Sequence, residues 1–269
     1  MSQAHNKLHL LPPRWGIALT ADDYGVVEKV WISREIADAA MLRRVADHEG
    51  PEIVGQNGKR NCAGILFSYY WPGQPSAFNH RIRRDQPDWE EKNGQPKQTA
   101  KYLGPPRGSN RLYIPPGVTP EQLADSTIPV AIVEGEKKAL ALWRLANHET
   151  ATPRFIPIAI EAIVELLNLP AGWNSYGARP IGPQNAVEAI RLLAKFVGPD
   201  TRPPAVVPRV RGGIQLEWHT ESIDVEVYID SPGNVSFFVD QVESGETFEG
   251  ALAGHEAVLK AWLQHISGK

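Results

Sequence analysis

One carboxylate, Glu134, stands at a position where chemistry is expected. It follows a short apolar run, Val130 to Val133, and precedes Gly135, after which the pattern becomes helical through Leu145. Sheets of α/β proteins place their functional groups at the carboxyl ends of strands, next to such turns. The sequence therefore predicts Glu134 as a candidate catalytic residue, with Gly135 allowing the chain to turn tightly.

Two lysines follow this turn at the start of the predicted helix. Lys137 and Lys138 occupy the first helical turn, where the helix dipole favours acidic residues instead. This misfit favours an anion-facing role for both side chains. The alternative is that they are exposed lysines, which are tolerated anywhere on a helix.

The segment from His80 to Tyr113 is the basic part of the chain, with eight Lys and Arg residues against four acidic ones. Tyr102 and Tyr113 are interleaved with them, and Gly104 to Asn110 reads as a polar loop. Such a surface suits phosphate or single-stranded nucleic acid, above all single-stranded DNA. The alternative is a solvated hairpin face whose arginines pack on the aromatic rings. With the two helical lysines, the candidate nucleic-acid contacts are Arg81, Arg83, Lys97, Lys101, Arg111, Lys137 and Lys138.

No metal-binding motif accompanies Glu134. The chain has eight histidines and one cysteine, without HExxH or CxxC spacing, and it contains no Asp-x-Asp. The closest substitute is Asp224-Val-Glu226, which alternates within a strand pattern and reads as the wet face of a sheet. A single carboxylate holds a divalent cation poorly. We therefore expect no cofactor, and Mg²⁺ only if Asp224 and Glu226 form a composite site with Glu134.

Several predicted elements would position these residues. Residues 62–71 read as a strand, and Ala77 to Arg84 as its antiparallel neighbour. Earlier in the chain, the stretch around residues 22–25 looks irregular, and Ser33 caps a helix that stops near Gly50-Pro51. Residues 155–160 would be a second parallel strand, completing a βαβ unit. The pattern over residues 158–169 is equally compatible with a helix.

The C-terminal part has a different pattern. A Pro- and Gly-rich seam ends at Pro183, which suits the first turn of a helix. Alternation then predicts three antiparallel strands, over residues 213–219, 223–230 and 235–239, and a closing helix from Leu252 to Ile266. Residues 205–269 hold ten acidic and four basic side chains, so direct contact with nucleic acid is not expected there. The candidate partner-binding residues of the C-terminal part are Trp173, Tyr176 and Trp218. Aromatic residues in the Pro- and Gly-rich seam can equally anchor that segment to its own domain.

Composition sets the broad class. The chain has 269 residues, 42% hydrophobic content and a net charge of −3. One cysteine allows no internal disulfide, and neither a signal-peptide core nor a membrane span is visible, so we expect a cytoplasmic, bacterial protein without membrane contact. The expected fold class is α+β. We expect a β-rich N-terminal region with an α/β unit over 1–160, a seam over 161–183 and a small α+β domain over 184–269.

Residues 14–160 resemble the N-terminal region of Toprim-containing primase-like proteins of plasmids, phages and other mobile elements. The segments that carry the resemblance are Phe67-Ser-Tyr-Tyr70, Arg81-Ile-Arg83, Lys101-Tyr-Leu103, Asn110-Arg-Leu-Tyr-Ile-Pro-Pro116 and Val133-Glu-Gly-Glu-Lys-Lys-Ala-Leu140. In that family the first-strand glutamate, here Glu134, acts with a later Asp-x-Asp pair that holds Mg²⁺. The resemblance implies nucleic-acid binding and, if the chain is an enzyme, Mg²⁺-dependent nucleotidyl or phosphoryl transfer. Because Asp-x-Asp is missing, it also implies a truncated Toprim unit with a degenerate site.

Two functions follow as expectations. The first is a mobile-element, primase-like protein that binds nucleic acid through residues 80–113 and has lost, or nearly lost, catalysis. The alternative is a non-enzymatic interaction module whose acidic C-terminal domain binds a protein. Residues 165–269 resemble small bacterial domains to which no activity is attached, so a fusion without a joint function is a third option.

Overall fold

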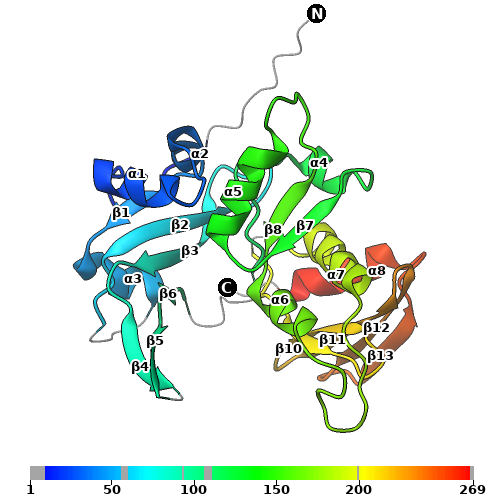
Figure 1. Ribbon diagram of the computed structural model, residues 1–269. Coiled ribbons are helices and arrows are strands. Elements are labelled where there is room, and N and C mark those ends of the chain that lie inside the picture. The colour runs from blue at the N-terminus through cyan, green and yellow to red at the C-terminus, as the bar shows by residue number, and fades with distance from the viewer. Residues whose placement is uncertain (1–9, 56–59, 93, 106–110, 199, 267–269) are drawn as a thin grey trace, which may run out of the picture. The chain divides into compact units, whose positions relative to one another are not determined.

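The computed structural model describes residues 10–55, 60–92, 94–105, 111–198 and 200–266. These residues form two compact units (Figure 1). Unit 1 comprises the described residues of Met1–Ser109 and Tyr113–Ala159. Unit 2 comprises those of Asn110–Leu112 and Ile160–Lys269. Both contain helices and sheets, which confirms the α+β class, and each unit is described by itself.

The main sheet of unit 1 has the order β1-β2-β3-β6, all antiparallel. Its strands are β1 (Arg43–Val45), β2 (Gly64–Tyr70), β3 (Ala77–Arg84) and β6 (Tyr102–Leu103). Every residue of β2 is buried because both faces of the sheet are covered. Ile65, Phe67 and Tyr69 point to one core, and Leu66 points to the other. The central hairpin of β2 and β3 therefore agrees with the predicted strand pair.

Short helices cover the two faces of this sheet. One core contains side chains from α1 (Ala21–Glu28), α2 (Arg34–Ala39) and α5 (Glu136–Ala146). The other contains residues of α3 (Gly50–Val54), which follows the short 3-10 helix η1 (Asp47–Glu49). The predicted irregular stretch at residues 22–25 is instead helix α1, because Thr20 and Asp23 form a capping box at its start. Ser33 does cap α2, but that helix ends at Ala39 rather than near Gly50.

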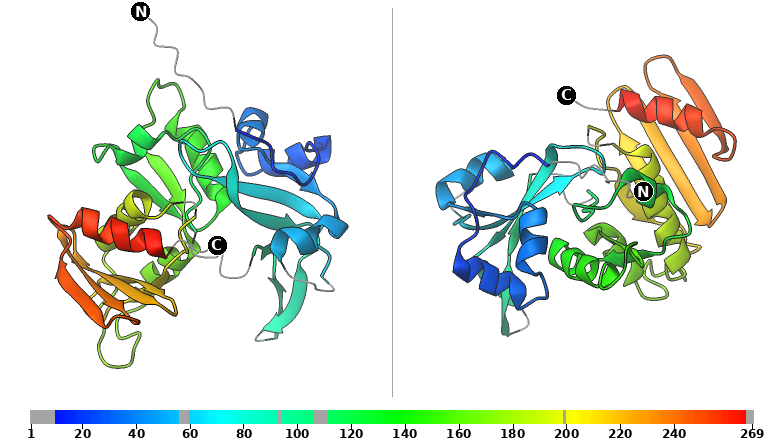
Figure 2. Two further views of the ribbon diagram at one scale, coloured as in Figure 1. Left: turned by 180° about the vertical axis from the view of Figure 1, so that it is seen from behind. Right: turned by 90° about the horizontal axis from the view of Figure 1, so that it is seen from above.

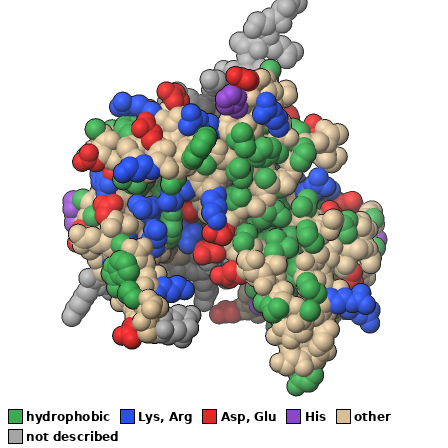
Figure 3. Space-filling view, in the orientation of Figure 1, with side chains coloured by type: hydrophobic (Ala, Val, Ile, Leu, Met, Phe, Trp, Pro, Cys, Tyr) green, Lys and Arg blue, Asp and Glu red, His purple; other side chains and the backbone are tan. Residues whose placement is uncertain are grey.

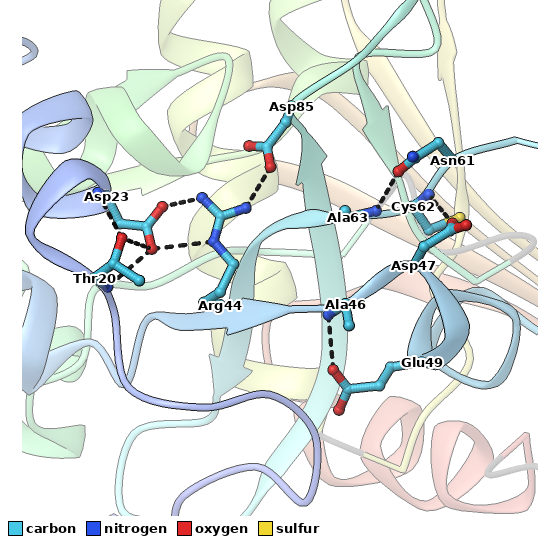
Figure 4. Close-up of polar contacts among 10 residues, drawn as sticks. All are labelled: Thr20, Asp23, Arg44, Ala46, Asp47, Glu49, Asn61, Cys62, Ala63 and Asp85. Carbon is cyan, nitrogen blue, oxygen red and sulfur yellow. Dashed lines mark hydrogen bonds and ion pairs between the residues drawn. The ribbon is translucent and has the colours of Figure 1, made fainter.

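An ion-pair network joins α1 to β1 (Figure 4). Asp23 is buried, and both of its carboxylate oxygens accept hydrogen bonds from Arg44, whose guanidinium also pairs with Asp85. Thr20 bonds the same carboxylate through its backbone amide at 2.9 Å and its hydroxyl at 2.8 Å. A buried charge is tolerated only with such partners, so this network fixes the helix against the sheet.

A βαβ unit completes unit 1. Strands β7 (Val130–Val133) and β8 (Ile156–Ala159) pair in parallel, and α5 connects them. The predicted strand–helix–strand order is therefore confirmed. The alternative of a helix after residue 158 also holds in part, since α6 (Glu161–Leu167) follows β8 directly. The backbone of Tyr113 exchanges two 2.9 Å hydrogen bonds with Ala159, and α4 (Pro120–Ala124) lies between Tyr113 and β7 in the chain.

A two-stranded hairpin extends the β3–β6 pair. Its strands are β4 (Asp88–Lys92) and β5 (Gln95–Thr99), with Trp89 opposite Gln98 and Glu90 opposite Lys97. The backbone amide of Arg84 bonds the carbonyl of Lys101 at 2.9 Å, at the junction between the two pairs of strands. Hence the basic segment flanks and includes this hairpin.

Unit 2 is built on an antiparallel sheet of order β13-β12-β11-β10-β9. The strands are β9 (Ala205–Pro208), β10 (Ile214–His219), β11 (Ile223–Ser231), β12 (Asn234–Gln241) and β13 (Glu246–Ala251). Helix α7 (Pro183–Phe196) packs on β10 and β11 and contacts α8 (Glu256–His265), which lies across the same side of the sheet (Figure 2). The predicted three-stranded sheet is thus extended by the edge strands β9 and β13. The closing helix begins at Glu256 instead of Leu252.

Several boundaries differ from the sequence-based division. The boundary between the compact units falls after Ala159, and residues 161–183, expected as a seam, include α6 and belong to unit 2. The predicted polar loop falls largely on residues 106–110, which lie outside the described residues, as does Pro199 beyond α7. Within the described ranges, no helix is long and apolar enough to cross a membrane.

Candidate functional site

Two carboxylates flank the start of α5, and they have different environments. Glu134 directly follows β7 with its side chain 57% exposed, and its Oε1 lies 2.6 Å from Lys138 Nζ. Glu136, the first residue of α5, is only 2% exposed at its side chain. Gly135 between them is extended at φ −165°, so this turn does not need glycine's left-handed freedom. The predicted role of Gly135 in a tight turn is therefore corrected.

The buried carboxylate of Glu136 has partners from the central sheet. The hydroxyl of Tyr69 on β2 donates to its Oε1 at 2.5 Å, and Nη1 of Arg81 on β3 lies 3.4 Å from the same atom. The Arg81 guanidinium in turn lies over the Tyr102 ring, 5.0 Å from its centroid. A helix start, two strands and the short β6 therefore converge on one carboxylate.

Sequence reasoning singled out Glu134 and missed Glu136. The helical period of α5 contains the missing signal, since Ala139, Leu140 and Trp143 are its buried apolar side chains. Residues three, four and seven positions apart share one helix face, so position 136 belongs to this inward stripe. A charged residue on such a stripe is expected to be paired within the fold.

Tyrosines surround Glu136. Burial, followed by the charge of Glu136, raises the pKa of Tyr69 and of Tyr113 well above the ordinary tyrosine value. The same two causes raise the pKa of Tyr102 to about 12. The rings of Tyr69 and Tyr113 meet edge to face with centroids 5.0 Å apart, and the buried Tyr113 hydroxyl has no hydrogen-bond partner among the described residues. All three hydroxyls therefore stay protonated at neutral pH.

Cations gather beside this group. Arg81 and Arg83 alternate onto the same face of β3, and Tyr102 on β6 stands opposite Arg83. The pKa of Lys137 is lowered by partial burial and then by the nearby charges of Arg83 and Lys101, while Glu136 opposes this shift. Lys and Arg side chains accordingly gather over β3 and the start of α5 in Figure 3. We call Arg81, Arg83, Lys101 and Lys137 the basic cluster.

The other three predicted cationic contacts are not part of the basic cluster. Lys97 is exposed on β5 of the hairpin, and Lys138 pairs with Glu134. Arg111 belongs to unit 2, where burial lowers its pKa and the charge of Asp200 opposes the shift. The basic cluster thus contains four of the seven predicted contacts.

The predicted partner-binding residues of unit 2 have three different environments. Tyr176 is 91% exposed on a loop in which Asn174 Oδ1 accepts from the amides of Tyr176 and Ala178. Trp173 is half-buried, and its indole nitrogen has no partner in the described part of the chain. Trp218 is a core residue whose indole donates to the Arg202 carbonyl at 2.8 Å. This burial corrects the prediction that Trp218 contacts a partner.

Asp224 and Glu226 lie on the uncovered face of the unit 2 sheet. His219 Nδ1 lies 3.0 Å from Asp224, and its Nε2 lies 3.4 Å from Glu217. Burial alone would lower the pKa of His219, but hydrogen bonds to these two carboxylates raise it above its usual value. Glu217, His219 and Glu226 place potential ligand atoms within 4.8 Å of one another, on an exposed acidic surface. Because Glu134 belongs to unit 1, the composite Mg²⁺ site stays a prediction.

Comparison of the chain with models of protein families, with curated proteins and with solved structures found no match in any of the three. The candidate site therefore has to be interpreted from its own geometry. It combines a clustered positive charge with buried hydroxyls and one internally paired carboxylate, which is an arrangement suited to binding an anion.

Proposed function

We propose that unit 1 binds single-stranded nucleic acid, with the basic cluster contacting its phosphates. The observation that carries the proposal is that Arg81 and Arg83 of β3, Lys101 just before β6, and Lys137 of α5 gather beside a single buried carboxylate. Cations that repel one another cost folding free energy. An anionic ligand that lies between them would remove this cost and gain charge-assisted hydrogen bonds.

The details of the cluster favour a strand of phosphates over a purely structural role. Glu136 contacts Arg81, whereas Arg83 meets the Tyr102 hydroxyl, and its buried Nε lacks a hydrogen-bond partner within the described residues. Arg83 and Lys101 also lie near Tyr102, and aromatic side chains beside a positively charged groove support base stacking in single-strand binding. These features support binding that tolerates many sequences.

Salt-dependent binding of a fluorescent single-stranded oligonucleotide tests this function. We expect affinity to fall steeply with salt, and Arg83→Ala with Lys101→Ala to reduce the slope of log K against log salt by about 1.4, at ~0.7 per phosphate contact. Lys137→Ala should weaken binding more than Lys138→Ala, its neighbour on the same helical turn, because Lys138 is already paired with Glu134. Absence of binding at low salt would refute the proposal.

The same proposal takes the chain to be a mobile-element protein of primase-like descent whose Toprim site is degenerate. The exposed ion pair between Glu134 and Lys138 supports it, since a catalytic carboxylate is usually held by a shaped and partly desolvated site. Primer synthesis in the presence of Mg²⁺ and nucleotides is the direct assay, and we expect none. Synthesis that is lost in Glu134→Ala would instead restore Glu134 as a catalytic residue.

A second candidate function is protein binding through unit 2. Its sheet is covered by helices on one side, while the other side places like charges opposite each other, Glu217 with Glu226 and Asp224 with Asp240. Such pairs destabilise a sheet, so a basic protein segment would be a favourable partner.

Binding of an oligolysine peptide to the full chain tests this second function. The expected result is salt-sensitive binding that weakens in Glu217→Gln with Asp240→Asn. Glu256→Gln removes one carboxylate at the start of α8, away from these strands, and serves as the control for charge loss outside the acidic face. Equal binding by all variants would remove the acidic face as the contact surface.

A further inference from the structure

The β4–β5 hairpin contributes no core to unit 1. Its described side chains from Trp89 to Gln98 are all exposed, and among them Trp89 is 62% exposed. A lone two-stranded ribbon is marginally stable in water. Because this hairpin buries so little, its contribution to folding does not explain why it carries a large apolar ring on its surface.

The base of the hairpin is nevertheless firmly held. Arg84, buried to 3% exposure, donates to Asp88 Oδ1 at 3.0 Å, to the Ala100 carbonyl at 3.1 Å and to the Asn61 carbonyl at 2.5 Å. Arg60 donates to the other Asp88 oxygen at 2.7 Å. The Arg84 guanidinium therefore contacts both sides of the hairpin where it leaves the main sheet. These contacts fix the base of the hairpin.

The base of the β4–β5 hairpin lies next to the basic cluster. Arg83 lies at the end of β3, and Lys101 lies between β5 and β6, so both residues flank the base of the hairpin. Trp89 stands opposite Gln98, three residues before Lys101 in the chain. In Figure 3, hydrophobic side chains of the hairpin and the Lys and Arg side chains over β3 appear on the same face of the molecule.

We propose that the β4–β5 hairpin presents Trp89 as a stacking platform for a base of the single strand whose phosphates lie on the basic cluster. This inference rests on the proposed function and adds a base contact to it. Because the base of the hairpin is fixed, Trp89 loses little conformational freedom when it binds a ligand. Every nucleic-acid base has a π face that can stack on its ring. The contact is therefore expected to be tolerant of sequence and specific for unpaired bases.

Two oligonucleotides of equal length separate the base contact from the phosphate contacts. One is oligothymidine, and the other carries abasic sugars with the same number of phosphates. We expect Trp89→Ala to weaken binding of oligothymidine by about 5- to 150-fold, as the loss of one base stack does. Its affinity for the abasic strand should equal that of the wild type, and Trp89→Phe should retain most of the oligothymidine affinity.

Trp31→Ala is the matched control, because Trp31 is also a surface tryptophan of unit 1, with 74% exposure. It should bind both strands as the wild type does. Unchanged oligothymidine binding by Trp89→Ala would overturn the stacking role while leaving phosphate binding intact. An equal loss on both strands would also overturn it, because the variant would then act on the phosphate contacts. A wild-type protein that binds neither strand would refute the proposed function itself, and this inference with it.

Discussion

The hydroxyl of Tyr69 donates a hydrogen bond to Glu136 Oε1 across 2.5 Å, joining strand β2 to the first residue of α5, 67 positions later. Arg81 on β3 lies near the same oxygen at 3.4 Å. This contact places the start of α5 against the sheet, and Lys137, the next residue, beside Arg83 and Lys101. The basic cluster therefore depends on a carboxylate that is internal to the fold.

The two glutamates at the start of α5 are expected to differ sharply in their effect on stability. Glu136→Ala leaves Tyr69 without its acceptor and should lower the free energy of unfolding by about 2–4 kcal/mol. Glu134→Ala removes an exposed i, i+4 ion pair and should cost no more than ~0.5 kcal/mol. Urea denaturation of both variants measures the difference. Equal costs would show that Glu136 is not the internal anchor of this helix.

The hydrogen bond itself can be tested through the neighbouring tyrosines of β2. Tyr69→Phe removes a bond to a charged group and should cost ~1.5–3 kcal/mol. Tyr70→Phe is the control, because the Tyr70 hydroxyl donates to the neutral Leu11 carbonyl at 2.8 Å, and its loss should cost ~0.5–1.5 kcal/mol. Urea denaturation measures the free energy of unfolding of both variants. A larger loss in Tyr70→Phe than in Tyr69→Phe would contradict the prediction that the Tyr69 bond to Glu136 is the stronger one.

Local patterns predicted the parts of the fold that bury regular apolar stripes. Strands β10 and β11 alternate in burial along their length as their sequence alternates, and Pro183 begins α7 as expected. The edge strands β9 and β13 bury less and carry no such pattern, so they were missed. Helix α2 ends where Met41 adopts a left-handed φ of 52°, a feature that a helical apolar pattern does not reveal.

The candidate site was predictable only in part. Composition predicted Arg81, Arg83 and Lys101, because residues 80–113 are rich in Lys and Arg, and the start of the predicted helix indicated Lys137. The grouping of these cations could not be predicted from the sequence, since Lys101 and Lys137 come together only when α5 packs on the sheet through Ala139 and Leu140. The choice between Glu134 and Glu136 likewise depends on which helix face is buried. Sequence motifs therefore predicted the region of the candidate site. Which side chains contact one another there depends on tertiary packing.

As the pH falls, protonation of His80 should destabilise unit 1 before the carboxylates of unit 1 are protonated. Burial, helped by the nearby charge of Arg14, lowers the pKa of His80 from 6.5 to about 4. The unfolded chain therefore takes up this proton first as the pH falls, so stability is unaffected above pH 6.5 and declines between 6.5 and 4. The full loss is about 3 kcal/mol, at ~1.36 kcal/mol for each pKa unit.

Urea denaturation at several pH values checks this loss. His80→Gln should flatten the profile between pH 6.5 and 4, because the glutamine takes up no proton. His148→Gln, at an exposed histidine outside the cores, should keep the wild-type profile. A decline in His80→Gln as steep as in the wild type would assign the pH dependence to another group.

Asp23 should contribute to the pH dependence of stability in a separate, more acidic range. Burial opposes its ionisation, but hydrogen bonds from Arg44 and Thr20 prevail and keep the pKa of Asp23 below its ordinary 3.8 (Figure 4). The folded state therefore holds the carboxylate ionised at a pH where the unfolded chain is already protonated. Its stabilising effect is complete well above pH 3.8 and is lost as the pH falls through the lowered folded-state pKa.

The two carboxylates that bind Arg44 allow a matched comparison by urea denaturation at neutral pH. Asp23→Asn removes the buried partner and should cost ~2–4 kcal/mol, because Arg44 is then left partly buried with only Asp85. Asp85→Asn removes the more exposed partner and should cost no more than about 1 kcal/mol. The Asp23→Asn variant should also show a shallower decline of stability in the acid range, because the share due to Asp23 is removed. Equal costs would mean that the buried half of the network does not fix α1 on the sheet.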